Sequence, residues 1–179
     1  MLYNMDMCKL STPFAHAKSV YEIDVAFFLK HGYSSIIVDL DNTLDSYRTK
    51  EPSPRAYELK QKLEANGIEM IIVSNNRGKR VNHYASLLGV RSISSAGKPF
   101  ARKLLRKMRE LNVAPSKVVL IGDRTVTDIA AGNRCKVCTI LTDKIVKEDQ
   151  PTTHFNRLFD RPIRRYLKRH NKLVDWRNR

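Results

Sequence analysis

The chain of 179 residues has few cysteines, few glycines and prolines, and no long apolar run. Three cysteines, an odd number, do not provide the disulfide framework of a small secreted protein. Seven glycines, seven prolines and 42% hydrophobic residues exclude collagen-like and disordered classes. No apolar run approaches the ~18 residues of a membrane span, and the first residues show no apolar core of a secretory signal. We therefore expect a globular, cytoplasmic protein.

Two of the cysteines, Cys135 and Cys138, form a C-x-x-C pair. No second pair and no histidine cluster accompanies them, whereas a zinc site requires four ligands. Ordinary packing near the start of a strand is therefore favoured over zinc or redox chemistry for this pair.

Acidic residues are scarce, with 18 Asp and Glu against 33 Lys and Arg, and the net charge is +15. The excess is uneven, because residues 155–179 contain nine basic and only two acidic residues. Such a balance favours an anionic partner, which could be nucleic acid, an acidic membrane surface or a phosphorylated substrate. Composition alone does not choose among these three.

Short apolar runs alternate with segments of helical periodicity, which predicts an α/β domain. The runs predicted as strands are 35–40, 68–74, 90–94, 117–122 and 137–141. The predicted helices are 52–67, 78–89, 99–112 and 127–134. Strands that are apolar throughout indicate a mainly parallel sheet covered on both faces, in three Rossmann-like layers. We expect one domain over 1–179, with its motifs in about 35–142 and a basic tail at about 155–179.

Individual residues support these boundaries and define the apolar faces. Ser53 is a candidate N-cap, followed by Pro54 in the first helical turn. The helix over 99–112 has five apolar residues at helical spacing, which we expect to share one buried face. They are Phe100, Leu104, Leu105, Met108 and Leu111.

Polar residues cluster directly after the predicted strands, where ligands bind in parallel sheets. They are Asp39 and Asp41, then Ser74, Asn75 and Asn76, then Asp123. Carboxylates that meet at one rim repel each other, and a hard divalent cation such as Mg²⁺ relieves that repulsion. Asp128, at the start of the next helix, could hold a metal-bound water.

The remaining polar residues suit a phosphoryl ligand. Ser74 and the backbone N–H groups after it can donate to phosphate oxygens, and Lys98, before a proline, supplies a point charge. One aspartate could then attack phosphorus, and another could serve as general acid and base. Taken singly, each residue has an ordinary structural explanation as a cap, a turn or a surface charge. The occurrence of all of them in this order along the chain favours a catalytic site over these separate structural explanations.

These segments together resemble the motifs of the haloacid dehalogenase-like (HAD) phosphatases, subfamily IIIA. The segments are DLDNTL at 39–44, Ser74 after the second strand, KP at 98–99 and GDRTVTD at 122–128. The resemblance implies that Asp39 is the nucleophile and Asp41 the general acid and base, with Ser74, Asn75 and Lys98 at the phosphate. It further implies a Mg²⁺ site made of Asp39, the backbone carbonyl of Asp41, Asp123 and Asp128.

Within that family, VSNN, KP, IGDRTVTDIAAGNR and the basic tail resemble the phosphatidylglycerophosphatase branch of bacteria and mitochondria. The implied substrate is phosphatidylglycerophosphate, an anionic lipid, in phospholipid synthesis. Two alternatives stay open. One is a nucleotide or polynucleotide phosphatase of the same fold, and the other is a non-catalytic module that binds nucleic acid or membranes. Filled catalytic positions argue against the second, and nucleic acid is possible but not favoured, because no aromatic residues interleave with the basic cluster at 102–109.

The spacing of the motifs predicts an open site, because only 32 residues lie between Asp41 and Ser74. A loop and one helix fill that interval and leave no room for a cap domain, which suits a substrate attached to a membrane or polymer. The tail could be an amphipathic helix on an anionic membrane or a helix packed on the domain. In the first case the protein would be peripheral on the membrane, and neutralising four residues should weaken vesicle binding but leave hydrolysis of a small soluble phosphate nearly unchanged. They are Arg164, Arg165, Lys168 and Arg169.

Overall fold

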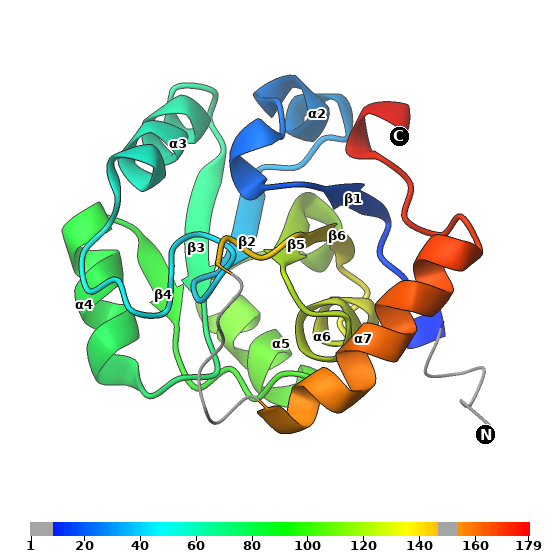
Figure 1. Cartoon of the computed structure of the whole chain (residues 1–179). Coiled ribbons are helices and arrows are strands. Elements are labelled where there is room, and N and C mark those ends of the chain that lie inside the picture. Colours follow the sequence, from blue (N-terminus) through cyan, green and yellow to red (C-terminus); the bar gives the residue numbers. More distant parts are fainter. Residues whose placement is uncertain (1–8, 147–153) are drawn as a thin grey trace.

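A computed structural model describes residues 9–146 and 154–179 of the chain. Its centre is a six-stranded parallel sheet of order β1-β6-β5-β2-β3-β4 (Figure 1). The strands are β1 (Ala15–Ala17), β2 (Ser35–Asp39), β3 (Glu69–Val73), β4 (Arg91–Ile93), β5 (Val118–Gly122) and β6 (Cys138–Thr142). All five pairings of neighbouring strands are parallel, so the predicted α/β class with a parallel sheet is confirmed.

Helices connect the strands and cover the sheet on both faces (Figure 1). The α-helices are α2 (Val25–Lys30), α3 (Pro54–Glu64), α4 (Gly78–Leu88), α5 (Ala101–Glu110), α6 (Ala130–Arg134) and α7 (His154–Arg169). Four shorter elements complete the description: the 3₁₀ turns η1 (Val20–Glu22), η2 (Pro115–Lys117) and η5 (Trp176–Asn178), and the π-helical turn η3 (Thr125–Ile129).

Alternate residues of the buried strands face two separate hydrophobic clusters. On β2, Ile36 and Val38 pack in the cluster that includes α2, α3 and α4, whereas Ile37 packs in the cluster that includes α5 and α6. Both faces are apolar because side chains point alternately to either side of a strand and helices cover both sides. This arrangement is the three-layer architecture that the sequence predicts.

The predicted helix ends agree with the observed capping. The Ser53 hydroxyl accepts a hydrogen bond from the Ala56 N–H, and Gly89 ends α4 in the left-handed region at φ 73°. The predicted face of α5 is only partly correct. Leu104 and Met108 are buried, but Phe100 precedes the first turn of α5 and is 71% exposed, because the helix begins one residue after it.

The first part of the described chain contributes elements that the sequence analysis does not predict. β1 has three residues and joins the sheet edge beside β6. The chain end covers the outer side of β1, since the His16 N–H donates to the Val174 carbonyl at 2.7 Å. Figure 1 shows the C-terminal segment returning to α2, where Lys30 Nζ donates to the Arg179 carbonyl at 2.8 Å.

The basic tail packs on the domain through α7. Ile163 and Leu167, the apolar residues of its inner side, are 1% and 0% exposed. Of the two alternatives for this helix, the packed one is therefore what the structure shows, and its buried apolar side is covered by protein. Among the residues that the structure describes, no helix has the length and apolarity needed to cross a bilayer.

The close packing of α6 against β6 can be tested by mutation. A Cβ added to Gly132 in α6 would lie 2.3 Å from Thr139 Cγ2 on β6, so we expect Gly132→Ala to destabilise the protein by about 1–3 kcal/mol. Thr139→Ser removes that methyl group and keeps the hydroxyl that contacts Asn133. In the Thr139→Ser background, Gly132→Ala should therefore cost little or increase stability, as measured by urea unfolding. Equal losses in both backgrounds would contradict this packing.

Candidate active site

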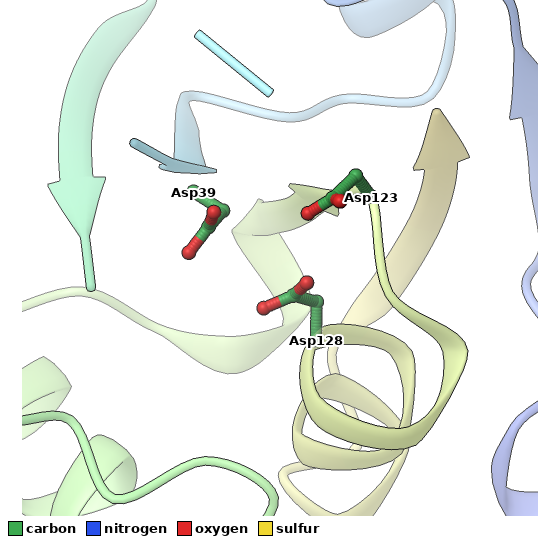
Figure 2. Close-up of side chains that lie close together, drawn as sticks. All are labelled: Asp39, Asp123 and Asp128. Carbon is green, nitrogen blue, oxygen red and sulfur yellow. The ribbon is translucent and has the colours of Figure 1, made fainter. Parts of the chain in front are cut away.

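The predicted polar residues meet at the carboxyl ends of the central strands. Asp39 is the last residue of β2, Ser74 follows β3, and Asp123 follows β5. Lys98 follows β4, and Asp128 lies in η3 after Asp123. Parallel neighbours present these ends at one edge, so residues far apart in the sequence converge there. Figure 2 shows the carboxylates of Asp39, Asp123 and Asp128 directed toward a common space.

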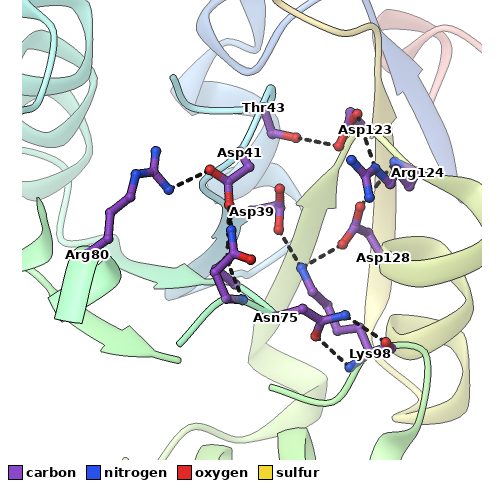
Figure 3. Close-up of polar contacts among 11 residues, drawn as sticks. Asp39, Asp41, Thr43, Asn75, Arg80, Lys98, Asp123, Arg124 and Asp128 are labelled. Atoms are coloured by element: carbon purple, nitrogen blue, oxygen red, sulfur yellow. Dashed lines mark hydrogen bonds and ion pairs between the residues drawn. The ribbon is translucent and has the colours of Figure 1, made fainter. Parts of the chain in front are cut away.

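The Lys98 ammonium group lies between two of these carboxylates (Figure 3). Its Nζ is 2.5 Å from Asp39 Oδ1 and 2.6 Å from Asp128 Oδ1. The side chains of Lys98 and Asp128 are each 2% exposed, and that of Asp39 is 10% exposed. A buried charge is costly unless it is paired, and Lys98 here pairs with two opposite charges.

The acidic cluster fits a divalent cation. Asp39, Asp123 and Asp128 each offer an oxygen within 4.8 Å of the others. Within the described part of the chain, Asp123 Oδ2 is buried and accepts no hydrogen bond, and Arg124 Nε lies 3.9 Å from it. Three carboxylates and one ammonium sum to a charge of −2, which a divalent ion neutralises. An all-oxygen donor set with an unsatisfied carboxylate oxygen is suited to Mg²⁺.

Burial and mutual repulsion perturb the titration of this cluster. Burial raises the pKa of Asp39 well above its ordinary value, and Asp128, Asp123 and Asp41 raise it further, although Lys98 opposes them. Burial, with Asp128 second, raises the pKa of Asp123 to about 7. For Lys98, burial lowers the pKa, but the Asp128 and Asp39 carboxylates outweigh burial and raise it. Lys98 is therefore charged at neutral pH.

Asp128 is held tightly against the strand. A Cβ added to Gly122 at the end of β5 would lie 2.4 Å from Asp128 Cβ, so only glycine fits beneath this carboxylate. Asp128 Oδ2 also accepts a hydrogen bond from the Arg124 N–H at 3.1 Å. The segment GDRTVTD thus brings its second aspartate back over its own glycine.

The Asp41 carboxylate lies outside the acidic cluster and faces β3 and α4. Its Oδ2 accepts hydrogen bonds from Ser74 Oγ at 3.1 Å and Asn76 Nδ2 at 2.8 Å. Its Oδ1 pairs with Arg80 Nη1 at 2.6 Å. Arg80 also donates to the carbonyls of Ser46 and Thr49, so it ties the loop after β2 to α4. The Asp41 side chain is thus engaged away from the acidic cluster, and the metal contact of its backbone carbonyl stays a prediction.

Asn75, directly after β3 and Ser74, contacts the backbone of Lys98. Its Oδ1 accepts from the Lys98 N–H at 2.8 Å, and its Nδ2 donates to the Lys98 carbonyl at 2.7 Å. The side chain is engaged with the backbone of Lys98 through both polar atoms, and its contact with a phosphate stays a prediction. Asn75 fixes the backbone from which Lys98 reaches the carboxylates (Figure 3).

Three further residues that the sequence analysis does not place in the site contact its margins. Thr43 Oγ1 donates to Asp123 Oδ1 at 3.4 Å. Arg164 of α7 donates to the Asp123 carbonyl and, at 2.8 Å, to the Thr142 carbonyl. Asp160, one turn earlier, accepts from both the N–H and the hydroxyl of Thr125 at 2.7 Å. The one sequence signal for these contacts of α7 is the spacing of Asp160 and Arg164, an acidic residue four positions before an arginine in a basic tail.

Because of these bonds, Arg164 does not belong with the surface charges of the tail. Its Nε is 3.2 Å from Asp160 and its Nη1 is 3.4 Å from Asp143. Neutralising Arg164 would also remove its contact with the backbone of Asp123, and the expectation that hydrolysis stays unchanged remains a prediction.

The two described cysteines behave as packing residues. Cys135 is buried in the hydrophobic cluster beneath α5, and burial raises the pKa of its thiol to about 11. Burial also raises the pKa of the Cys138 thiol. Raised pKa values disfavour the reactive thiolate form of both cysteines. Within residues 9–146 and 159–179, the cluster able to hold a metal contains aspartates alone.

Comparison with known proteins agrees with this site. The family model of the haloacid dehalogenase-like hydrolases matches residues 16–136, which include every aspartate of the cluster. The chain is 34% identical to the "Probable phosphatase YqeG" of Bacillus subtilis, over 90% of this chain and 94% of that protein. The chain therefore belongs to the haloacid dehalogenase-like hydrolases, and within that family it is a phosphatase.

More distant relatives add two findings. The chain is 24% identical to "Phosphatidylglycerophosphate phosphatase 1, chloroplastic/mitochondrial" of Arabidopsis thaliana, over 91% of this chain, and spans 50% of that protein. Among solved structures, the cobalt-bound deoxy-D-mannose-octulosonate 8-phosphate phosphatase of Haemophilus influenzae matches with a TM-score of 0.51 and 16% identity. That match covers 64% of this chain and 80% of the other, and it shows the shared fold.

The raised pKa of Asp123 predicts how stability depends on pH without metal. Its folded value of about 7 exceeds the ordinary value of 3.8, so the folded state retains a proton that the unfolded chain loses. This contribution to the free energy of unfolding is fully present below pH 4 and is lost as pH rises through about 7. In EDTA, Asp123→Asn should remove that loss, measured by urea unfolding at pH 5 and pH 8.

Magnesium provides the matching measurement. Because the cation binds the ionised carboxylates, it should raise the melting temperature of the wild-type protein more at pH 8 than at pH 5. The increase should be much smaller in Asp123→Asn. Parallel pH profiles for the two proteins in EDTA, or equal stabilisation of both by Mg²⁺, would contradict the proposed site.

Proposed function

We propose that this phosphatase hydrolyses phosphomonoesters with Mg²⁺ through an aspartyl-phosphate on Asp39, and that its substrate is phosphatidylglycerophosphate. The observation that carries the chemistry is the acidic cluster joined by Lys98 at the end of β2. Asp39 lies at the strand end, within 4.8 Å of the other cluster oxygens and paired with a cation. A nucleophilic carboxylate needs such a setting to approach an anionic phosphoryl group.

The reaction has two steps. An Asp39 oxygen attacks phosphorus, the bond from phosphorus to the alcohol oxygen breaks, and Asp41 gives that oxygen a proton. Asp41 then removes a proton from water as the water oxygen attacks phosphorus, which frees Asp39 and releases inorganic phosphate. The position of Asp41 supports this division of roles, because its carboxylate bonds to Ser74, Asn76 and Arg80 instead of joining the acidic cluster.

Asp39, Asp123 and Asp128, with the backbone carbonyl of Asp41, are the ligands we assign to Mg²⁺. When bound, the cation would neutralise the charge of the carboxylates and of the phosphate. Lys98 and Ser74 are the groups that we assign to the phosphate oxygens. Lys98 Nζ already occupies a position between two carboxylates, and Asn75 keeps its backbone in place.

Three observations support the lipid substrate. The phosphatidylglycerophosphate phosphatases of Arabidopsis thaliana and Chlamydomonas reinhardtii are 24% and 25% identical to this chain. The described residues 42–73 provide only the loop after β2, α3 and β3, which leaves no cap domain in this interval. The net charge of +15 favours an anionic surface. We therefore propose a cytoplasmic enzyme that associates peripherally with anionic membranes.

The nucleophile is tested by Asp39→Asn, which keeps the shape of the side chain and removes its charge. Hydrolysis of p-nitrophenyl phosphate should fall on the order of 10³-fold or more, as for other catalytic nucleophiles. The melting temperature should not fall, because a neutral amide is less costly to bury than a carboxylate. Near-normal turnover by the folded variant would rule out attack by Asp39.

The substrate is tested with a panel presented under the same conditions. Phosphatidylglycerophosphate in vesicles should be hydrolysed faster than glycerol phosphate, nucleotides or phosphorylated DNA ends. Binding to the vesicles should weaken with salt, because each Lys or Arg near an anionic surface contributes about 1 kcal/mol within a Debye length. A preference for nucleotides or DNA ends would replace the lipid by the alternative substrate while leaving Asp39 chemistry intact.

A further inference from the structure

A cavity of about 550 Å³ lies beside α7 at the carboxyl ends of β1 and β6. Its lining residues are His16, Asp143, Arg164, Arg165, Lys168 and Leu173. We propose that this cavity binds the phosphate group of a second anion, one that is not the substrate group attacked by Asp39.

The charges of the cavity favour a phosphate. Arg164 is engaged with Asp160, Asp143 and backbone carbonyls, so it forms a wall. Arg165 and Lys168 are exposed, and in the described part of the chain neither side chain forms an ion pair or hydrogen bond. They are three positions apart and so lie on one side of the helix. A guanidinium fork and an ammonium group side by side match the oxygens of a phosphate.

The other lining residues indicate which chemical groups can be attached to the phosphate. Asp143 is the acidic residue of the wall, and it is occupied by His16 at 3.2 Å and Arg164 at 3.4 Å. Leu173 adds an apolar side chain that can contact carbon attached to the phosphate. The ligand class is therefore a phosphate that is either free or esterified, as in the headgroup of an anionic lipid.

The strand order separates this cavity from the reacting group. Asp39 ends β2, and the order β1-β6-β5-β2 puts β6 two strands and β1 three strands away. At about 4.8 Å per strand the separation is on the order of 10–15 Å. A phosphate in the cavity is thus too distant to be the group that Asp39 attacks, although Arg164 connects the cavity wall to the carbonyl of Asp123.

Two charge-matched double variants test the site. Arg165→Gln with Lys168→Gln removes the two free cations of the cavity. Arg161→Gln with Arg169→Gln removes the same charge from exposed positions of the same helix that do not line it. Both proteins are first checked by melting temperature, so that a loss of binding reports on the site instead of on folding.

The first arm uses inorganic phosphate without magnesium, followed by NMR of the His16 ring. We expect a saturable shift in the wild type and in the Arg161/Arg169 control, and at least about tenfold weaker binding in the cavity variant, which loses two charge-assisted contacts. The second arm measures sedimentation with vesicles of phosphatidylcholine and phosphatidylglycerol. A lipid headgroup as ligand predicts a loss for the cavity variant about tenfold larger than for the control.

A selective effect in the first arm alone identifies free phosphate as the ligand, and one in the second arm identifies a lipid headgroup. Equal behaviour of the two double variants in both arms would overturn the proposal, because only total charge would then matter. The inference does not depend on the proposed reaction. Failure of that reaction would appear separately, as the absence of Asp39-dependent hydrolysis in the wild-type protein.

Discussion

The double ion pair of Lys98 with Asp39 and Asp128 is the interaction on which the candidate site depends. One buried cation brings together the ends of β2, β4 and β5, whose carboxylates would otherwise repel each other. Burial, and then the neighbouring Asp128 carboxylate, raise the pKa of Asp123, and the charge of −2 that remains in the cluster fits a divalent cation. The surrounding contacts position this pair: Asn75 holds the backbone of Lys98, and Gly122 leaves room for Asp128.

The C-terminal helix extends this arrangement outward. A basic tail looks like a surface feature, but α7 buries Ile163 and Leu167 and places Arg164 on the backbone carbonyl of Asp123. Four other cations of the helix are exposed: Arg161, Arg165, Lys168 and Arg169. The helix therefore has two sides with separate parts in the protein: one supports the metal-binding segment, and the other carries the positive charge that favours an anionic partner.

The sequence predicts the cluster because strand ends in a parallel sheet meet at one edge, and each aspartate directly follows an apolar run. It does not predict the contacts of Asn75, because its partner Lys98 lies 23 residues away and depends on how the chain turns after β4. β1 has three residues and no periodic pattern, and only its pairing with β6 defines it. Phe100 shows the converse error, since helical spacing alone does not fix where α5 begins.

The central claim is that Asp39 carries the phosphoryl group during turnover. Rapid quenching of the enzyme with Mg²⁺ and substrate, followed by borohydride, reduces an acyl phosphate on aspartate to homoserine, which peptide mass spectrometry locates. We predict homoserine at position 39. With p-nitrophenyl phosphate, whose leaving group needs no proton from Asp41, there should be more of it in Asp41→Asn, because the second step lacks its base. Homoserine at another aspartate, or none during sustained turnover in either protein, would contradict the mechanism.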